Sequence, residues 1–248
     1  MKYILPKKAN KQKPGGIMKK FICWVGIILV TFCIIACSSG NAGGLSHDMQ
    51  SNIAFSIESG DNWLEKVRIL IFNINSTPQY AAWIEDDNGN YIATIAVTNW
   101  TARNSRRTSP GGNRSHTLPV WSYIRHNVPA PDTLDAVSSA TPKGSITFPV
   151  SNELLSSGNT YNVYLEVNRS FDFNEFWTRN NSGNNGQPSV IYHAQFTMGS
   201  STYADLVPIG QGSVDGSNGT IVLNLENVTT ALGMIKNVRL MFYTIEGL

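Results

Sequence analysis

Cysteine is nearly absent from this chain, and the few that exist lie near its beginning. Cys23, Cys33 and Cys37 are the three cysteines among 248 residues, and none follows position 37. The body of the protein therefore cannot form disulfides, use a thiol in catalysis, or bind zinc or iron–sulfur clusters through thiolates. Histidine is scarce as well, and the four histidines lack the paired His-x-x-x-His spacing that is typical of zinc sites.

The sequence fingerprints of common enzymes are also missing. The chain has no Gly-x-Ser-x-Gly nucleophile turn, no phosphate-binding glycine loop and no dinucleotide-binding fingerprint. Carboxylates cluster at Glu85, Asp86 and Asp87, but they precede an Asn-Gly pair, which predicts a solvated hairpin turn. We therefore predict neither a catalytic residue nor a metal site, and a hydrolase is the least favoured class of function.

The first forty residues predict export and lipidation. Residues 21–35 are almost wholly apolar, Lys19 and Lys20 precede them, and a small residue, Ala36, follows. This pattern is typical of a secretory signal, and the apolar span is too short for a stable membrane helix. Ile34-Ile35-Ala36-Cys37 resembles the lipobox of bacterial lipoproteins. The resemblance implies cleavage before Cys37 and attachment of lipid to its sulfur.

The predicted chain has three parts. Residues 1–36 are the signal peptide, whose true start codon we expect at Met18. Residues 37–50 form a lipidated tether rich in Ser, Gly and Asn, and residues 51–248 form one domain. We expect the protein to be anchored through its lipid on the extracytoplasmic side of a bacterial membrane, in the periplasm or on an outer membrane where the cell has one.

Charge is distributed unevenly along the chain. All 17 acidic residues follow Cys37, whereas 7 of the 19 basic residues precede it, so the mature chain carries a formal charge of −5. This acidic excess argues against nucleic acid as a partner. Residues 99–126, however, contain five arginines and no acidic residue, which predicts a long basic loop.

Two interpretations of the basic loop remain open. In one, it docks an anion, such as a phosphate, an acidic polymer or a lipid headgroup, and its tryptophans stack on a flavin or sugar ring. In the other, its arginines are solvated and donate hydrogen bonds to backbone carbonyls. The residues concerned are Trp100, Arg103, Arg106, Arg107, Arg114 and Trp121.

Alternating apolar and polar residues predict an all-β fold. Short runs of this pattern, separated by turn residues, recur along the body of the chain, whereas helical periodicity is scarce. We predict a single β-sandwich, with immunoglobulin-like layering as one arrangement, and place Trp83 in its core. The expected strands are residues 53–57, 67–72, 80–85, 91–98, 145–150, 161–167, 190–198, 221–225 and 238–243.

A polar block lies at the end of the strand expected at 161–167. Its members are Glu166, Asn168, Arg169, Asp172, Asn174 and Glu175. Their oxygen atoms suit a calcium or sugar site, but the spacing is not that of a calcium-binding loop with a central glycine. We therefore favour a structural role, in which Arg169 pairs with Asp172 or Glu175 and holds the end of the strand.

Residues 134–141, Leu-Asp-Ala-Val-Ser-Ser-Ala-Thr, resemble the flavinylation motif of bacterial FMN-binding domains. That motif reads Asp, a small residue, any residue, Ser or Thr, Gly, Ala, and then an acceptor Thr or Ser. A transferase takes FMN from FAD and joins its phosphate to the acceptor hydroxyl. The resemblance implies Thr141 as the acceptor and Asp135 as the acidic residue that the transferase recognises, with Ser138, Ser139 and Ala140 between them.

Two departures from the motif leave a second interpretation open. Ser139 stands where the family has Gly, and Pro142 follows the acceptor position. The alternative is an ordinary loop in which Ser138 or Ser139 caps a turn.

Several sequence blocks, in the same order, look like a bacterial periplasmic family catalogued as domain of unknown function 2271. These blocks are residues 79–86, 118–121, 135–143, 164–177 and 186–192. The resemblance implies an extracytoplasmic β-domain whose genes tend to lie near those of flavin-linked redox proteins.

The combined resemblances predict a lipid-anchored protein that carries covalent FMN on Thr141 in extracytoplasmic electron transfer. Its expected partners are the membrane, a flavin transferase and redox proteins. The alternative is a non-catalytic envelope lipoprotein, which would use the arginine-rich loop to bind a partner or a polysaccharide.

Overall fold

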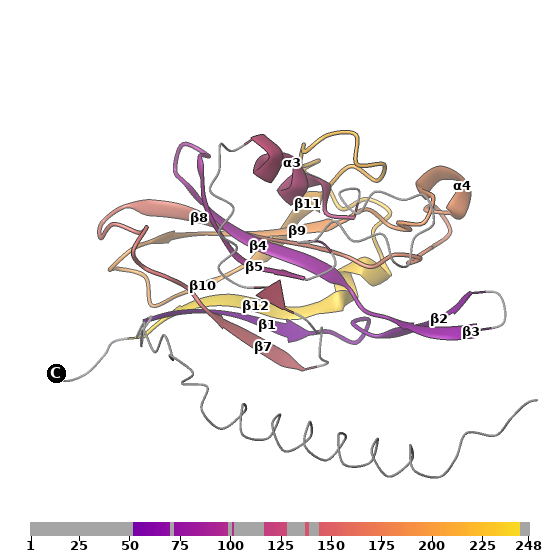
Figure 1. Ribbon diagram of the computed structural model, residues 1–248, viewed down its shortest axis with the longest axis horizontal. Coiled ribbons are helices and arrows are strands. Elements are labelled where there is room, and N and C mark those ends of the chain that lie inside the picture. The colour runs from indigo at the N-terminus through magenta and orange to yellow at the C-terminus, as the bar shows by residue number, and fades with distance from the viewer. Residues whose placement is uncertain are drawn as a thin grey trace, which may run out of the picture. The chain divides into compact units, whose positions relative to one another are not determined.

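Two β-sheets lie face to face in the body of the chain, which confirms the predicted all-β sandwich (Figure 1). The computed structural model describes residues 52–69, 72–98, 101, 117–127, 137–138 and 144–243. The four-stranded sheet has the order β10 (Tyr203–Asp205), β12 (Ile235–Phe242), β1 (Ile53–Ser59) and β7 (Ser145–Pro149). The six-stranded sheet has the order β11 (Val207–Gln211), β9 (Val190–Thr197), β8 (Thr160–Asn168), β4 (Gln79–Asp86), β5 (Tyr91–Thr98) and β6 (Val137–Ser138).

The main core lies between the two sheets because each strand turns alternate side chains inward. Phe55 and Ile57 of β1 are fully buried, as are Val163 and Leu165 of β8 in the facing sheet. Trp83 is also fully buried, as predicted, but it belongs to a second apolar cluster on the outer face of the six-stranded sheet. The sandwich therefore buries apolar side chains on both faces of its larger sheet.

The second cluster is covered by α3 (Pro119–Asn127), a helix within the segment predicted as a basic loop. Proline is well suited to the first position of a helix, since the amide hydrogen it lacks has no partner there. Val120 and Trp121 in the first turn are buried against the sheet. The prediction of a long loop over 99–126 is therefore wrong for the residues of α3, and residues 99–100 and 102–116 lie outside the described chain.

The edge strand β6 pairs in parallel with β5. Val97 lies opposite Val137, and Thr98 lies opposite Ser138. Parallel neighbours need a crossover connection of a dozen or more residues. The connection from β5 to β6 contains α3. A single crossover therefore accounts for both the helix and the parallel edge strand.

Strand β1 joins the beginning and the end of the described chain. It pairs with β12 from Ile53 opposite Phe242 to Ser59 opposite Ile235. Beyond this ladder, the Tyr243 amide donates to the Asn52 carbonyl at 2.7 Å. The first and last described residues therefore lie at the same end of the sandwich.

Two expected strands take other forms. The run at residues 67–72 is divided between β2 (Glu65–Ile69) and β3 (Phe72–Ser76), which form an antiparallel pair with Ile69 opposite Phe72. The run at residues 221–225 makes a single bridge, between Val222 and Gln211, instead of a strand. Periodicity alone predicted extended backbone in both runs but not where each strand would find its partners. The remaining described helices are α4 (Arg179–Ser182) and the 3-10 helix η2 (Thr230–Met234).

Candidate functional site

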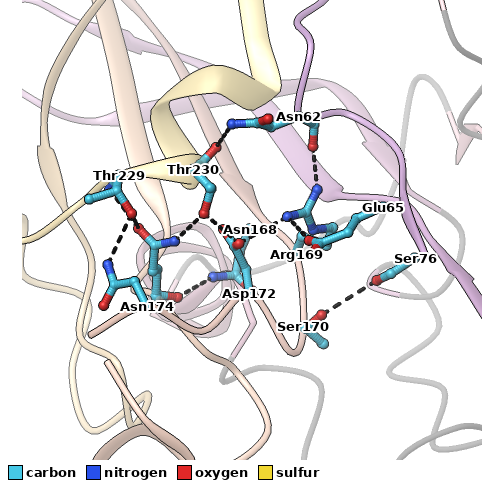
Figure 2. A network of polar contacts seen from close by, with 11 residues as sticks. Asn62, Glu65, Ser76, Asn168, Arg169, Ser170, Asp172, Asn174, Thr229 and Thr230 are labelled. Carbon is cyan, nitrogen blue, oxygen red and sulfur yellow. Dashed lines mark hydrogen bonds and ion pairs between the residues drawn. The ribbon is translucent and has the colours of Figure 1, made fainter. Parts of the chain in front are cut away.

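A buried cation, Arg169, lies immediately after the last residue of β8 (Figure 2). Only 1% of its surface is exposed, and its guanidinium donates to Asp172 Oδ1 at 2.9 Å. It also donates to the Asn62 carbonyl and to the Glu65 carboxylate. Arg169 therefore joins the loop between β8 and β9 to the start of β2 and to the turn before it. The predicted pairing with Asp172 is confirmed.

Asp172 fixes the other side of this loop. Its Oδ1 accepts a hydrogen bond from the Thr230 hydroxyl at 2.6 Å, and its carbonyl accepts one from the Gln187 amide at 2.8 Å. Asp172 is 3% exposed. Its Oδ2 is buried and has no hydrogen-bond partner, so the bonds of Oδ1 alone do not decide the calcium site considered from sequence. No group of three His, Cys, Asp or Glu side chains in the described part of the chain is arranged to hold a metal ion.

The backbone of this loop has positive φ angles at Phe171 and Gly186. Phe171 has a φ of 67°, a left-handed conformation that L-residues other than glycine rarely adopt. Gly186 has a φ of 75° and packs so tightly that a Cβ atom would lie 2.5 Å from the Asp172 carbonyl oxygen. Strained backbone persists only where surrounding contacts enforce it, and here the Arg169–Asp172 pair supplies those contacts.

We expect Gly186→Ala to destabilise the protein more than Gly89→Ala does. Gly89 has a φ of 79° but nothing within 4 Å of an added Cβ, so its replacement costs only backbone strain, about 1–2 kcal/mol. Gly186→Ala adds overpacking against Asp172, which typically costs about 1–3 kcal/mol more. Urea denaturation of both variants measures the difference, and equal losses would contradict the close packing at Gly186.

The loop presents aromatic rings to solvent. Phe173 is 37% exposed and Phe176 is 51% exposed, and the Phe176 and Trp177 rings meet edge to face with centroids 4.9 Å apart. Asn174 holds this turn, because its Oδ1 accepts the Phe176 amide at 3.0 Å and the Trp177 amide at 2.7 Å. Its Nδ2 donates to the Asn227 carbonyl at 2.8 Å. The exposed rings are therefore carried on a loop with extensive internal bonding.

A second buried charge, Glu166, caps helix α3. It is 0% exposed, and its carboxylate accepts hydrogen bonds from the Val120 amide at 3.2 Å, the Trp121 amide at 2.8 Å and the Ser189 hydroxyl at 2.6 Å. Burial raises the pKa of Glu166 to about 7, against the lowering effect of these three donors. A negative charge at a helix N-terminus also stabilises the helix. Glu166 thus fixes α3 on the outer face of the six-stranded sheet.

Trp121 belongs to the same helix, and its side chain is buried. It is 3% exposed, and its Nε1 donates to Thr94 Oγ1 at 3.0 Å. The Arg125 guanidinium lies over its ring, 5.5 Å from the centroid. This burial argues against the predicted role of Trp121 in stacking on a ligand. The indole instead packs in the second apolar cluster.

A row of three rings crosses the outer face of the same sheet. Trp83, Tyr164 and His193 lie in register on neighbouring strands, with centroid separations of 5.1 Å and 4.7 Å. Asn162 Nδ2 donates to the Asp86 carbonyl, so Asn162 Oδ1 faces His193 Nε2 at 2.9 Å and that nitrogen carries the proton. Burial lowers the pKa of His193, so its imidazole is neutral at neutral pH.

Most of the residues singled out in the flavinylation motif and the basic loop lie outside the described part of the chain. Ser138 is described and forms the end of β6, opposite Thr98 of β5. The residues outside are Cys37, Trp100, Arg103, Arg106, Arg107, Arg114, Asp135, Ser139, Ala140 and Thr141. The roles predicted for them therefore remain predictions.

Sequence reasoning missed the roles of Glu166 as a helix cap and of Asn62 and Thr230 as partners in the Arg169 network. Asn62 lies 107 positions from Arg169, and no local signal links residues so far apart. A comparison with protein-family models, curated proteins and solved structures found no match to this chain. No helix in the described ranges is both long and apolar enough to cross a membrane.

Proposed function

We propose that the protein is a lipid-anchored extracytoplasmic carrier of FMN, joined through its phosphate to the hydroxyl of Thr141. The observation that carries this proposal is the position of β6. Val137 and Ser138, two central residues of the motif, form the outermost strand of the six-stranded sheet. A modifying enzyme has to reach its target from outside, and an edge strand is the part of a sheet most accessible to another protein.

The neighbours of Thr141 in the chain support the same proposal. Thr141 is three residues from Ser138 and three from Gly144, and both of these residues are described. The strand that precedes it, β6, and the strand that follows it, β7, each form the edge of a sheet, so the described residues on both sides of the acceptor belong to edge strands. Gly144 has a φ of 116° and nothing within 4 Å of an added Cβ, which leaves open space beside this glycine.

Attachment of FMN requires the protein to present one accessible hydroxyl group and little else. In the reaction expected from the motif, the threonine oxygen attacks the FMN phosphorus of FAD, AMP leaves and the hydroxyl proton is lost. The bound flavin supplies the redox chemistry, and the protein positions it. An edge position for the motif fits this requirement, because a residue packed between the two sheets would be closed to the transferase.

The proposal predicts an FMN adduct that depends on Thr141. Mass spectrometry of the protein, co-expressed with an active flavin transferase, should detect the adduct in the unchanged protein and lose it in Thr141→Ala. Thr147→Ala is the matched control, since Thr147 is an exposed threonine on β7 and should leave the adduct intact. Absence of the adduct from the unchanged protein would end the proposal and leave an anchored binding protein.

A further inference from the structure

Trp83 is the only tryptophan in the described part of the chain whose indole donates a hydrogen bond to a carboxylate. Its Nε1 lies 2.8 Å from Glu85 Oε1. Trp121 donates to a threonine hydroxyl instead, and the Nε1 atoms of Trp63 and Trp177 are buried with no hydrogen-bond partner. A carboxylate is a common general base, whereas a hydroxyl is a poor proton acceptor. The Trp83 indole therefore has a base at its N–H group.

Glu85 is buried beside this indole, although its sequence context predicted a solvated turn. Only 9% of its surface is exposed. Trp83 and Glu85 are two positions apart on β4, so they lie on the same face of the sheet. Burial raises the pKa of Glu85 and the nearby charge of Asp86 adds to the effect, while the hydrogen bond from Trp83 opposes it. The Glu85 charge in turn helps to raise the pKa of Tyr164, after burial. Glu85 thus holds a proton more tightly than a carboxylate in water.

The Trp83 ring is closed to water but is connected to the surface by the next ring of the row. Trp83 is 0% exposed and stacks on Tyr164, with centroids 5.1 Å apart and ring planes 13° apart. Tyr164 is half-buried, and the His193 ring follows it at 4.7 Å. Stacked rings in contact are strongly coupled electronically. An electron can therefore pass from the buried indole through Tyr164 to an acceptor on the outer face of the sheet.

One-electron oxidation is the chemistry that this arrangement suits. Indoles, phenols and thiols are the side-chain groups that lose a single electron most readily, and no cysteine follows position 37 to compete. Loss of an electron makes the indole N–H group strongly acidic. Transfer of that proton to a neighbouring carboxylate leaves two neutral groups, and neutral groups avoid the large cost of a charge in an apolar environment.

We propose that Trp83 is a one-electron redox site, with Glu85 as its proton acceptor and the ring of Tyr164 as the path of the electron. A one-electron oxidant at the outer face takes an electron from the indole. The Nε1–H bond breaks, and the proton moves along the 2.8 Å hydrogen bond to Glu85 Oε1, where an O–H bond forms. The products are a neutral tryptophanyl radical, protonated Glu85 and the oxidant reduced by one electron. This reaction needs no flavin and does not rest on the proposed function.

A ruthenium polypyridyl photosensitiser attached to the outer face tests the site. Gln195 is exposed and lies opposite Asn162 on this face, so Gln195→Cys provides one thiol for attachment in a full chain whose three native cysteines are replaced by serine. The chain also carries Tyr164→Phe, which keeps a stacked ring but removes the phenol that would take over the radical. A laser flash with a soluble quencher generates ruthenium(III) at pH 8, to keep Glu85 ionised. Transient absorption should then detect a neutral tryptophanyl radical, which should be lost in Trp83→Phe.

Glu85→Gln separates the proton acceptor from the indole. Glutamine can still accept the hydrogen bond from Trp83 but cannot take its proton, so the yield of the neutral radical should fall at least about tenfold, with the radical cation in its place. Trp63→Phe is the matched control, because Trp63 is equally buried but has no base at its Nε1, and it should leave the signal unchanged. Equal yields of the neutral radical with and without Glu85→Gln, or a signal that persists in Trp83→Phe, would overturn the proposal.

Discussion

Replacing Arg169 with methionine is expected to destabilise the protein by about 3–5 kcal/mol, the typical cost of breaking a buried ion pair by removing one partner. Asp172 is 3% exposed and would lose its counter-ion, and Glu65 and the Asn62 carbonyl would each lose a donor. Methionine retains much of the volume, so the loss reports on charge and hydrogen bonding. Urea denaturation, followed by tryptophan fluorescence, measures this loss in the free energy of unfolding.

A surface ion pair supplies the control for Arg169. Arg239 donates to Asp205 at 2.5 Å and 2.8 Å, but these side chains are 39% and 42% exposed. Arg239→Met should therefore destabilise the protein much less than Arg169→Met, since exposed pairs are screened by solvent. A loss of stability in Arg169→Met no larger than that in Arg239→Met would contradict the structural importance of the buried network.

Glu166 is expected to make the protein more stable as pH falls from 8 to 5. Its pKa is about 7 in the folded protein and 4.5 in a model peptide, so the folded state binds the proton more tightly. The resulting stabilisation is complete below pH 4.5 and is lost as pH rises through 7. Between pH 8 and pH 5 the free energy of unfolding should rise by about 2–3 kcal/mol from this group alone.

The contribution of Glu166 is isolated by comparison with Glu166→Gln. Glutamine does not titrate, so the difference in unfolding free energy between the two proteins should change by that amount over the same range. Asp86 and Asp205 have lowered pKa values and oppose the trend, but they are present in both proteins and cancel. A difference that stays constant from pH 5 to pH 8 would contradict the raised pKa.

Strands and one ion pair were predictable because their signals are local. Alternation places Trp83 in a strand, and the Asn88-Gly89 pair predicts the turn between β4 and β5, where Gly89 has a φ of 79°. Arg169 and Asp172 are three positions apart, so their pairing could also be inferred from sequence. Each of these features depends on residues close together in the chain.

Features that depend on distant parts of the chain were missed. Glu166 follows a buried leucine in β8, and alternation alone would place its carboxylate in solvent. It is buried because α3, more than 40 positions earlier, covers that face of the sheet and directs two amides toward it. Likewise, Trp121 was assigned to a loop since nothing local indicates that its helix packs on the sheet. Such contacts are decided by tertiary packing.

The hydrogen bond between Tyr243 and Asn52 has a consequence for engineering. Because these two residues are bonded at 2.7 Å, a short linker could join them and new termini could be opened in a surface turn, such as the one at Asp87 and Asn88. A circular permutant of this kind would carry its strands in the same arrangement. A fluorescent protein fused after Tyr243 would emerge beside Asn52 and leave the other end of β1 unobstructed.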